Sequence, residues 1–394
     1  MKNIVICLDG TGNQIEENIS NVLKLYRCIH KDDTQVAYYD QGIGTLGRSD
    51  TWGRWKQALR NAVLGMGFGL GLDDIVVNAY RFLVTHYEDG DQIFLFGFSR
   101  GAYAARVLAA MLYEVGLIDP DQIHLSRAAL LAYKQSHVPS DVTSNAQSDD
   151  EYEGEGANFR RVMGTRTVAI EFLGLWDTVS SVLVPNYKGI FWPPIVRETL
   201  PHTDRNPGVA RCRHAIAIDE RRRMFRSQHW DADQTFKPNW HASGTPLPQD
   251  ALEVWFAGSH SDIGGGYPKD DSGLSQFPLI WMIEQAGASG LRVRQRMARY
   301  VSGQAPYTST TKYLYPKPDS RAKAHESLTG LWWLLEWLPK RRSMRESAPS
   351  RSLLGYYLPR GERRRIREEA RIHDSVHERL NAGVGYKPDN LPAG

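Results

Sequence analysis

The segment Asp91–Met111 reads DQIFLFGFSRGAYAARVLAAM, and it predicts a buried strand, a tight turn and a helix in direct succession. The apolar run at 93–96 is short enough for a buried strand, and small apolar residues then recur at helical spacing. Between them, Gly97 and Gly101 flank Ser99 in a G-x-S-x-G turn. Glycine tolerates the strained, crowded backbone of a sharp strand-to-helix reversal. This context is typical of a serine nucleophile that projects from the edge of a sheet.

Ser99 is therefore the first candidate catalytic residue. The backbone N–H of Arg100 lies at the start of the expected helix, where N–H groups have no partner within the helix and attract negative charge. We therefore expect this group to serve as an oxyanion donor. The alternative is a βα turn with an incidental serine, because G-x-S-x-G also occurs by chance.

Length and composition indicate a soluble globular protein with one large domain or two. The chain has 394 residues, of which 41% are hydrophobic and 24% charged. A net charge of +3 is too small to suggest nucleic-acid binding. Its three cysteines form no zinc pattern, which favours a reducing compartment. The N-terminus predicts a strand rather than a signal peptide, and no apolar run could span a membrane, so we expect a cytoplasmic location unless a signal-independent system exports the chain.

The loop after the first expected strand carries Asp9, Gly10 and Thr11. Phosphatases of the haloacid dehalogenase type have an Asp-x-Asp-Gly-Thr loop at this place, but Cys7 occupies the position of their nucleophilic aspartate. The other use of such a loop is to supply the second backbone donor of an oxyanion hole, from Gly10 or Thr11. A tight turn with a structural Asp9 is the remaining interpretation.

Two further residues follow expected strands in the order Ser, Asp, His. Asp177 ends the strand predicted over 167–175, where the acid of a catalytic triad is expected. His260 lies in a glycine-rich loop directly after the strand predicted over 252–257, which fits a general base. Asp262 offers an alternative acid, a support for the backbone of this loop, or half of a metal site. Two ligands two residues apart are weak evidence for a metal, and we expect no metal and no organic cofactor.

The remaining segments predict a cap and a helical C-terminal region. Residues 209–223, with His214, look helical, and four arginines between 221 and 226 form a basic cluster that either faces solvent or contacts phosphate. Near the C-terminus, Trp332, Trp333 and Trp337 precede a second basic cluster. Aromatic residues beside basic ones are typical of an interfacial membrane segment, although a core helix is an equal alternative.

These elements predict an α/β fold of the α/β-hydrolase type, with a mostly parallel sheet flanked by helices. We expect a catalytic domain over 1–290, which includes a polar surface loop at 136–160 and a cap-like insertion at 180–250. Residues 291–394 should form a helical, basic region packed on that domain, with a lid or membrane contact.

The motifs resemble those of the DUF2235 family, which includes the first class of type VI secretion lipase effectors. The matching motifs are the 9–13 loop followed by Asn21-Val22, GFSRGA from Gly97, GLWDTV from Gly174, the loop from Gly258 to Tyr267 and, more weakly, AIDERR from Ala217. The resemblance implies an α/β-hydrolase fold and phospholipase A activity, with Ser99 as nucleophile, Asp177 as acid and His260 as base. It also implies an immunity or delivery protein as partner, if the chain is secreted.

The sequence thus predicts a serine hydrolase that cleaves carboxylic esters, most specifically a phospholipase A-type lipase that needs no cofactor. Two alternatives remain open at this point. One is a soluble carboxylesterase or thioesterase with the same triad. The other is a binding or scaffold protein that keeps the hydrolase sheet without its chemistry.

Overall fold

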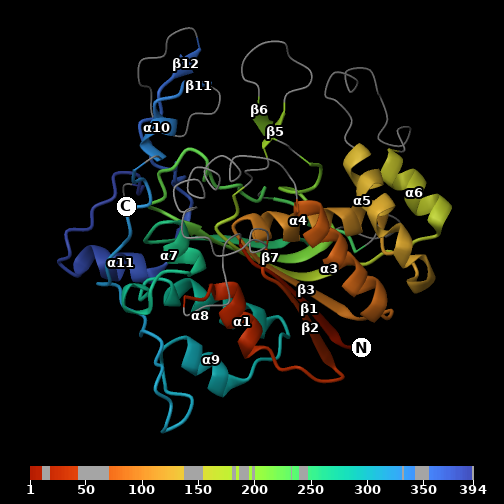
Figure 1. The fold of residues 1–394 in the computed structure, drawn as a ribbon, viewed down its shortest axis with the longest axis horizontal. Coiled ribbons are helices and arrows are strands. Elements are labelled where there is room, and N and C mark those ends of the chain that lie inside the picture. The colour runs from red at the N-terminus through yellow and green to blue at the C-terminus, as the bar shows by residue number, and fades with distance from the viewer. Residues whose placement is uncertain are drawn as a thin grey trace, which may run out of the picture.

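The structure is a computed structural model of the chain. It describes residues 1–10, 18–42, 71–136, 154–179, 183–185, 195–197, 200–231, 233–238, 247–330, 332–341 and 355–392. Within these ranges the central feature is a seven-stranded sheet in which every neighbouring pair of strands is parallel (Figure 1). Its order is β13-β10-β7-β4-β3-β1-β2.

The strands of this sheet are short and largely buried, as expected for parallel strands covered on both faces. Their bounds are β1 (Asn3–Leu8), β2 (Gln35–Asp40), β3 (Gln92–Phe98), β4 (Ile170–Trp176), β7 (Val209–Ala217), β10 (Asp250–Phe256) and β13 (Arg371–Ile372). All six residues of β1 are buried, because this strand lies inside the sheet between β2 and β3.

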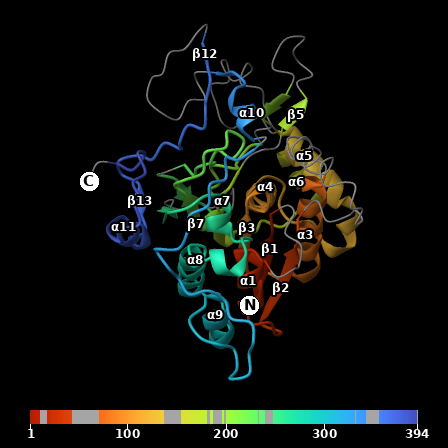
Figure 2. The ribbon, with the colours of Figure 1, turned by 60° about the vertical axis from the view of Figure 1, so that its left-hand side comes forward.

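Helices cover both faces of the sheet (Figures 1 and 2). One face packs against α3 (Leu72–His86) and α4 (Arg100–Val115), with α5 (Ser126–Gln135) and α6 (Glu155–Met163) outside them. The other face packs against α1 (Asn21–Cys28) and α8 (Gln276–Ala288). Alternate residues of β1 enter the two cores, since successive strand side chains point to opposite faces. The three-layer α/β architecture predicted from the sequence is confirmed.

Smaller elements complete the described chain. The helices are α7 (His260–Gly264), α9 (Gln295–Val301), α10 (Trp332–Glu336), α11 (Asp374–Asn381) and the 3₁₀ turns η1 (Pro120–Leu125) and η2 (Lys269–Asp271). Three two-stranded pairs lie outside the main sheet: β5 (Leu183–Pro185) with β6 (Ile195–Arg197), β8 (Thr235–Phe236) with β9 (Leu247–Pro248), and β11 (Lys340–Arg341) with β12 (Tyr356–Tyr357).

The strand order reverses at β1. From β1 the chain first moves outward to β2, and then returns to the other side of β1 to form β3, from which it continues to β4, β7, β10 and β13. In an open parallel sheet, the loops that leave the carboxyl ends of strands on either side of such a reversal diverge and create a crevice. The loops after β1 and β3 therefore frame the expected position of the site.

The structure corrects the prediction that residues 209–223 are helical. Residues 209–217 form β7, a central strand, so the expected insertion at 180–250 includes part of the main sheet. The error came from polar residues in this strand. Arg211 pairs with Glu171 of β4, and Arg213 with Asp250 of β10, so their charges are neutralised by neighbouring strands. A strand whose polar residues have such partners loses the hydrophobic pattern by which strands are recognised.

Two other boundaries also differ from the predictions. Residues 155–160 of the expected polar loop are helical in α6, while 137–153 lie outside the described residues. In the described part of 291–394, helices occupy only the short spans of α9, α10 and α11, and β13 joins the main sheet beside β10. The C-terminal region is therefore mainly extended chain and turns rather than helical. Among the described residues, no helix is both long and apolar enough to span a membrane.

Three of the four arginines of the first basic cluster bind residues of this C-terminal region. Arg221 donates to the carbonyl oxygen of Gly361, and Arg223 donates to those of Leu335 and Leu338. Arg226 forms an ion pair with Glu362. Arg222 pairs with Glu220 instead. All four arginines therefore make contacts within the protein, so the cluster is not simply a solvated face.

Candidate active site

The turn after β3 holds Ser99 in a strained backbone conformation. Its φ of 58° is positive, which is rare for a residue with a side chain. The flanking glycines are required by space, because a Cβ at Gly97 would lie 2.4 Å from the carbonyl oxygen of Gly101. A Cβ at Gly101 would lie 2.2 Å from the carbonyl oxygen of Leu8. The G-x-S-x-G segment is thus a sharp turn packed against the end of β1.

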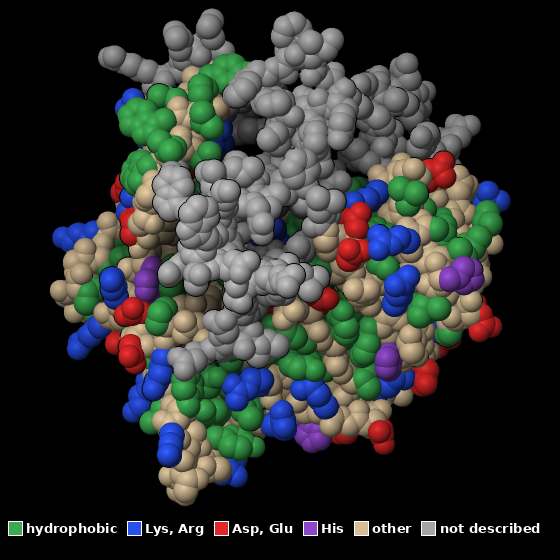
Figure 3. All heavy atoms as spheres, in the orientation of Figure 1, with side chains coloured by type: hydrophobic (Ala, Val, Ile, Leu, Met, Phe, Trp, Pro, Cys, Tyr) green, Lys and Arg blue, Asp and Glu red, His purple; other side chains and the backbone are tan. Residues whose placement is uncertain are grey.

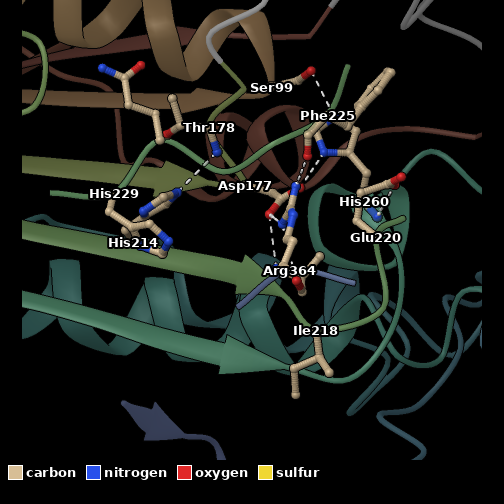
Figure 4. A network of polar contacts seen from close by, with 12 residues as sticks. Ser99, Asp177, Thr178, His214, Ile218, Glu220, Phe225, His229, His260 and Arg364 are labelled. Carbon is tan, nitrogen blue, oxygen red and sulfur yellow. Dashed lines mark hydrogen bonds and ion pairs between the residues drawn. The ribbon is translucent and has the colours of Figure 1, made fainter. Parts of the chain in front are cut away.

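Three side chains from three strand ends form a continuous hydrogen-bonded line (Figure 4). Ser99 Oγ lies 2.8 Å from Nε2 of His260. Nδ1 of the same ring lies 2.5 Å from Oδ2 of Asp177. All three are at most 7% exposed. The sequence predicts this set from the place of each residue after an expected strand and from the order Ser, Asp, His, and the fold brings the three residues together.

His260 is held by a helix cap rather than by a free loop. It is the first residue of α7, which begins with a capping box: Ser259 and Asp262 each bind the other's backbone N–H. The ring lies between Phe98, with centroids 4.7 Å apart, and the edge-on ring of Phe225 at 4.9 Å. Burial lowers the pKa of His260, while its hydrogen bond to Asp177 opposes that effect. A lowered pKa keeps the imidazole neutral, the form that a general base needs.

The carboxylate of Asp177 has partners on both oxygens. Oδ1 accepts from the N–H of Ala217 at 3.0 Å, and the guanidinium of Arg364 contacts both oxygens, at 2.5 and 3.0 Å. Burial by itself would raise the pKa of this carboxyl. The charges and hydrogen bonds of Arg364 and His260 outweigh burial and hold it well below its usual range, so Asp177 is ionised.

Asp262, the alternative acid, points elsewhere. Its Oδ2 accepts the N–H of Ser259 at 2.8 Å, and its Oδ1 lies 2.7 Å from Nδ1 of His325. The ring of His325 stacks on Tyr267 with centroids 3.6 Å apart. Asp262 therefore supports the loop that carries His260, one of the roles considered from the sequence.

A second buried histidine lies behind Asp177, and sequence reasoning missed its contribution. The backbone N–H of Thr178 donates to Nε2 of His214 at 3.1 Å (Figure 4). Nδ1 of His214 therefore carries the proton and donates to Glu253, which lies directly across from it on β10. Burial lowers the pKa of His214 to about 4, so the ring is neutral. The pair fixes the backbone next to Asp177. The available signal in the sequence was a pair of polar residues, His214 and Glu253, in two segments that form adjacent strands.

The loop after β1 is organised by Asp9. Its Oδ2 accepts hydrogen bonds from Ser20 and from the hydroxyl of Tyr39, which ties β1 to α1 and β2. Its Oδ1 accepts the N–H of Gly10 at 2.7 Å, so that donor is engaged. Thr11, the other expected donor, lies outside the described residues. Arg100 is the first residue of α4, so its backbone N–H lies at the amino end of that helix, directly after Ser99.

The three tryptophans of the α10 segment differ in their surroundings. Trp332 is half-buried, and its ring meets that of Phe225 edge-on at 5.5 Å. Trp333 and Trp337 are 38% and 54% exposed. Among the described residues, no group of three or more His, Cys, Asp or Glu side chains could hold a metal ion.

The order of the parallel strands, the strained turn at Ser99 and the line of Ser99, His260 and Asp177 at the carboxyl edge of the sheet are the features of the α/β-hydrolase fold. Residues 2–285 match the model of the Tle1-like phospholipase effector family of type VI secretion, catalytic domain. The chain belongs to this family. An uncharacterized protein of Saccharomyces cerevisiae, YEL023C, is 24% identical in an alignment that covers 99% of this chain and 80% of that protein.

Two solved structures are similar as well. An uncharacterized protein from Pseudomonas aeruginosa is 20% identical, with a TM-score of 0.39 over 74% of this chain and 46% of that chain. The Tle1 effector bound to the VgrG spike of the type 6 secretion system is 21% identical, with a TM-score of 0.33 over 69% of this chain and 52% of that one. The chain thus spans about half the length of either solved structure.

Proposed function

We propose that this protein is a serine esterase of the phospholipase A type, which releases a fatty acid from a glycerophospholipid through an acyl-enzyme. The observation that carries the proposal is the line from Ser99 through His260 to the ionised Asp177, with contacts of 2.8 and 2.5 Å. Family membership supports a phospholipid as the source of the ester.

In the first half of the reaction, Ser99 Oγ attacks the ester carbonyl carbon while its proton moves to Nε2 of His260. Asp177 stabilises the imidazolium, because its Oδ2 accepts a hydrogen bond from the Nδ1–H of that ring. The tetrahedral intermediate then collapses, the C–O bond to the glycerol breaks, and His260 returns the proton to the leaving oxygen. The products of this half are a lysophospholipid and an acyl group on Ser99.

In the second half, water attacks the acyl carbon and gives a proton to His260. Collapse of the second intermediate breaks the bond to Ser99, which takes the proton back from His260, and a fatty acid leaves. The N–H of Arg100 is the proposed donor to the oxyanion in both halves, because it opens α4 directly beside Ser99. The prediction that Thr11 supplies a second donor stays a prediction.

An exposed apolar surface around α10 supports contact with lipid. Figure 3 shows hydrophobic side chains gathered at the upper left, where α10 lies in Figure 1. In this part of the chain Trp333, Leu334, Trp337 and Leu338 are each at least 38% exposed. The guanidinium of the exposed Arg360 lies 4.9 Å from the ring centre of Trp337, which places positive charge beside the apolar surface. Aromatic and basic side chains together suit the interface of an anionic membrane.

We expect the double variant Trp333→Ala, Trp337→Ala to bind anionic phospholipid vesicles at least about tenfold more weakly than wild type, since two large apolar side chains are lost. Hydrolysis of a short-chain soluble ester should be unchanged. Vesicle co-sedimentation measures the binding. Leu131→Ala, which removes a 55% exposed apolar side chain from α5, is the matched control and should bind as wild type does. Equal binding by the double variant and wild type would remove α10 from the lipid contact.

The proposed activity is tested by product analysis on mixed phospholipid vesicles, with a short-chain soluble ester in parallel. We expect equal amounts of free fatty acid and lysophospholipid, because the acyl ester is the bond that breaks. Cleavage of the soluble ester alone would favour the carboxylesterase alternative. Release of diacylglycerol or of the free headgroup would contradict attack at an acyl carbon. If neither substrate is cleaved, the proposed activity is wrong.

A further inference from the structure

A buried arginine from the C-terminal region lies against the acid of the proposed triad. Arg364 is 1% exposed, and Nη1 and Nη2 of its guanidinium lie 2.5 and 3.0 Å from the two oxygens of Asp177. This two-point contact fixes the plane of a carboxylate as well as its charge. Arg364 lies beyond residues 2–285, the part of the chain that matches the catalytic domain of the family.

The guanidinium is itself held from several directions. Nη1 also donates to the carbonyl oxygen of Ala217 at 3.1 Å, and Nη2 also donates to that of Phe225. The carbonyl oxygen of Arg364 accepts from Nδ2 of Asn390 at 3.0 Å. Because its surroundings lock the side chain, Arg364 can hold Asp177 in one orientation, with Oδ2 directed at Nδ1 of His260 (Figure 4).

The same region contacts the site at a second point. His325 donates its backbone N–H to Oδ2 of Asp262 at 3.1 Å, and its ring nitrogen lies 2.7 Å from Oδ1. Asp262 in turn caps the helix that begins with His260. The carboxylate that binds the His260 ring, Asp177, and the one that caps its helix, Asp262, therefore both take partners from residues after 285. Contacts of Arg223 and Arg226 with this region, described above, attach it to the loop after β7.

We propose that Arg364 is a positioning residue of the active site, and that the C-terminal region completes the catalytic machinery instead of forming a separate appendage. The proposal rests on the function proposed above. Its physical basis is that a fully buried carboxylate needs both a counter-charge and filled hydrogen bonds. Arg364 supplies the counter-charge of Asp177 and occupies one side of Oδ2, so this oxygen can accept a second hydrogen bond from His260.

Arg364 also limits how strongly Asp177 attracts a proton onto His260. The charged groups that act on His260 are Asp177, Glu220 and Arg222, and the Ser99 hydroxyl binds the other ring nitrogen. Arg364 acts on His260 through Asp177, whose carboxylate it contacts. Burial opposes ionisation of Glu220, but Arg222 outweighs it and lowers the Glu220 pKa to about 2, so this pair is neutral overall. Loss of the Arg364 charge would leave Asp177 unbalanced, and His260 would then keep its proton to higher pH.

The test compares Arg364→Met and Arg364→Lys with a matched control, Arg379→Gln. Arg379 is also a buried arginine of the C-terminal region, but it donates to the carbonyl oxygens of Ser320 and Ala322 and does not touch the triad. The readout is the rate of labelling of the full-length protein by a fluorophosphonate across pH 5–9, divided by the folded fraction from circular dichroism.

We expect Arg364→Met to react about 100-fold more slowly, because the acid is no longer oriented. The acid limb of its pH profile should also move up by about one pH unit. Arg364→Lys keeps the charge without the two-point contact, so it should lose rate but keep the wild-type acid limb. Arg379→Gln should lower thermal stability and leave the pH profile unchanged, as a purely structural arginine would.

A folded Arg364→Met with wild-type rate and profile would overturn the proposal. If the Met variant does not fold, a wild-type labelling rate in Arg364→Lys would overturn it, because the two-point contact would then be dispensable. Failure of wild-type protein to label at any pH is a different outcome: it would remove the proposed serine chemistry, and the role of Arg364 with it.

Discussion

Ser99→Ala should lower hydrolysis of a short-chain ester by roughly four to six orders of magnitude, because the variant has no group that can form the acyl-enzyme. Folding should be unaffected, since the Ser99 hydroxyl contacts His260 and the strained turn is set by Gly97 and Gly101. Initial rates measured with matched protein concentrations test this. Ser289→Ala, which removes a hydroxyl that donates to the carbonyl oxygen of Gln285 at the end of α8, is the control and should retain wild-type activity.

Residual activity within about tenfold of wild type would assign the reaction to another nucleophile. A water molecule activated by His260 would be the first alternative to examine. With such residual activity, the turn after β3 would have a structural role only, and Ser99 would not be the nucleophile.

Asp177→Asn should lower kcat/KM by about four orders of magnitude, because an amide can present the wrong hydrogen-bonding group to Nδ1 of His260 and cannot stabilise the imidazolium. Asp262→Asn should lose less than about tenfold in activity. That variant weakens the cap at Ser259 and the contact with His325, so its main effect should be about 1–3 kcal/mol of lost stability. Steady-state kinetics and thermal unfolding of both variants separate the two roles.

The opposite pattern, with Asp262→Asn inactive and Asp177→Asn active, would contradict the assignment of the acid. Glu253→Gln is a useful third variant. It alters the partner of His214 behind Asp177 without touching the three aligned side chains, and we expect a loss between those of the other two variants.

Ser99, Asp177 and His260 can be predicted from the sequence because each stands in a recognisable local pattern. The glycines around Ser99 indicate a tight turn, in which Ser99 has a positive φ. Asp177 and His260 each follow an apolar run that forms a strand. Parallel strands end at one edge of the sheet, so residues at three strand ends meet even though they are far apart in the chain. The order of Ser, Asp and His then predicts the roles.

The residues that the sequence does not reveal share a different property. The role of each one depends on a partner that is distant in the sequence or lies on a neighbouring strand. Arg364 lies in a run of arginines and glutamates that looks solvent-exposed, yet it pairs with Asp177, 187 residues earlier. Arg213 and His214 interrupt the apolar pattern of β7, and a central strand holds them because Asp250 and Glu253 of the adjacent strand pair with them. No local periodicity contains this information, since it depends on which strands are neighbours.

Peptide mapping after fluorophosphonate treatment tests the central claim, that Ser99 is an activated nucleophile, most directly. Native protein would be labelled at pH 8, digested and analysed by mass spectrometry, beside heat-unfolded protein and Ser99→Ala. We predict one adduct per chain, on the hydroxyl of Ser99, in native protein only. An adduct on another residue, or no adduct in a folded sample, would contradict the account.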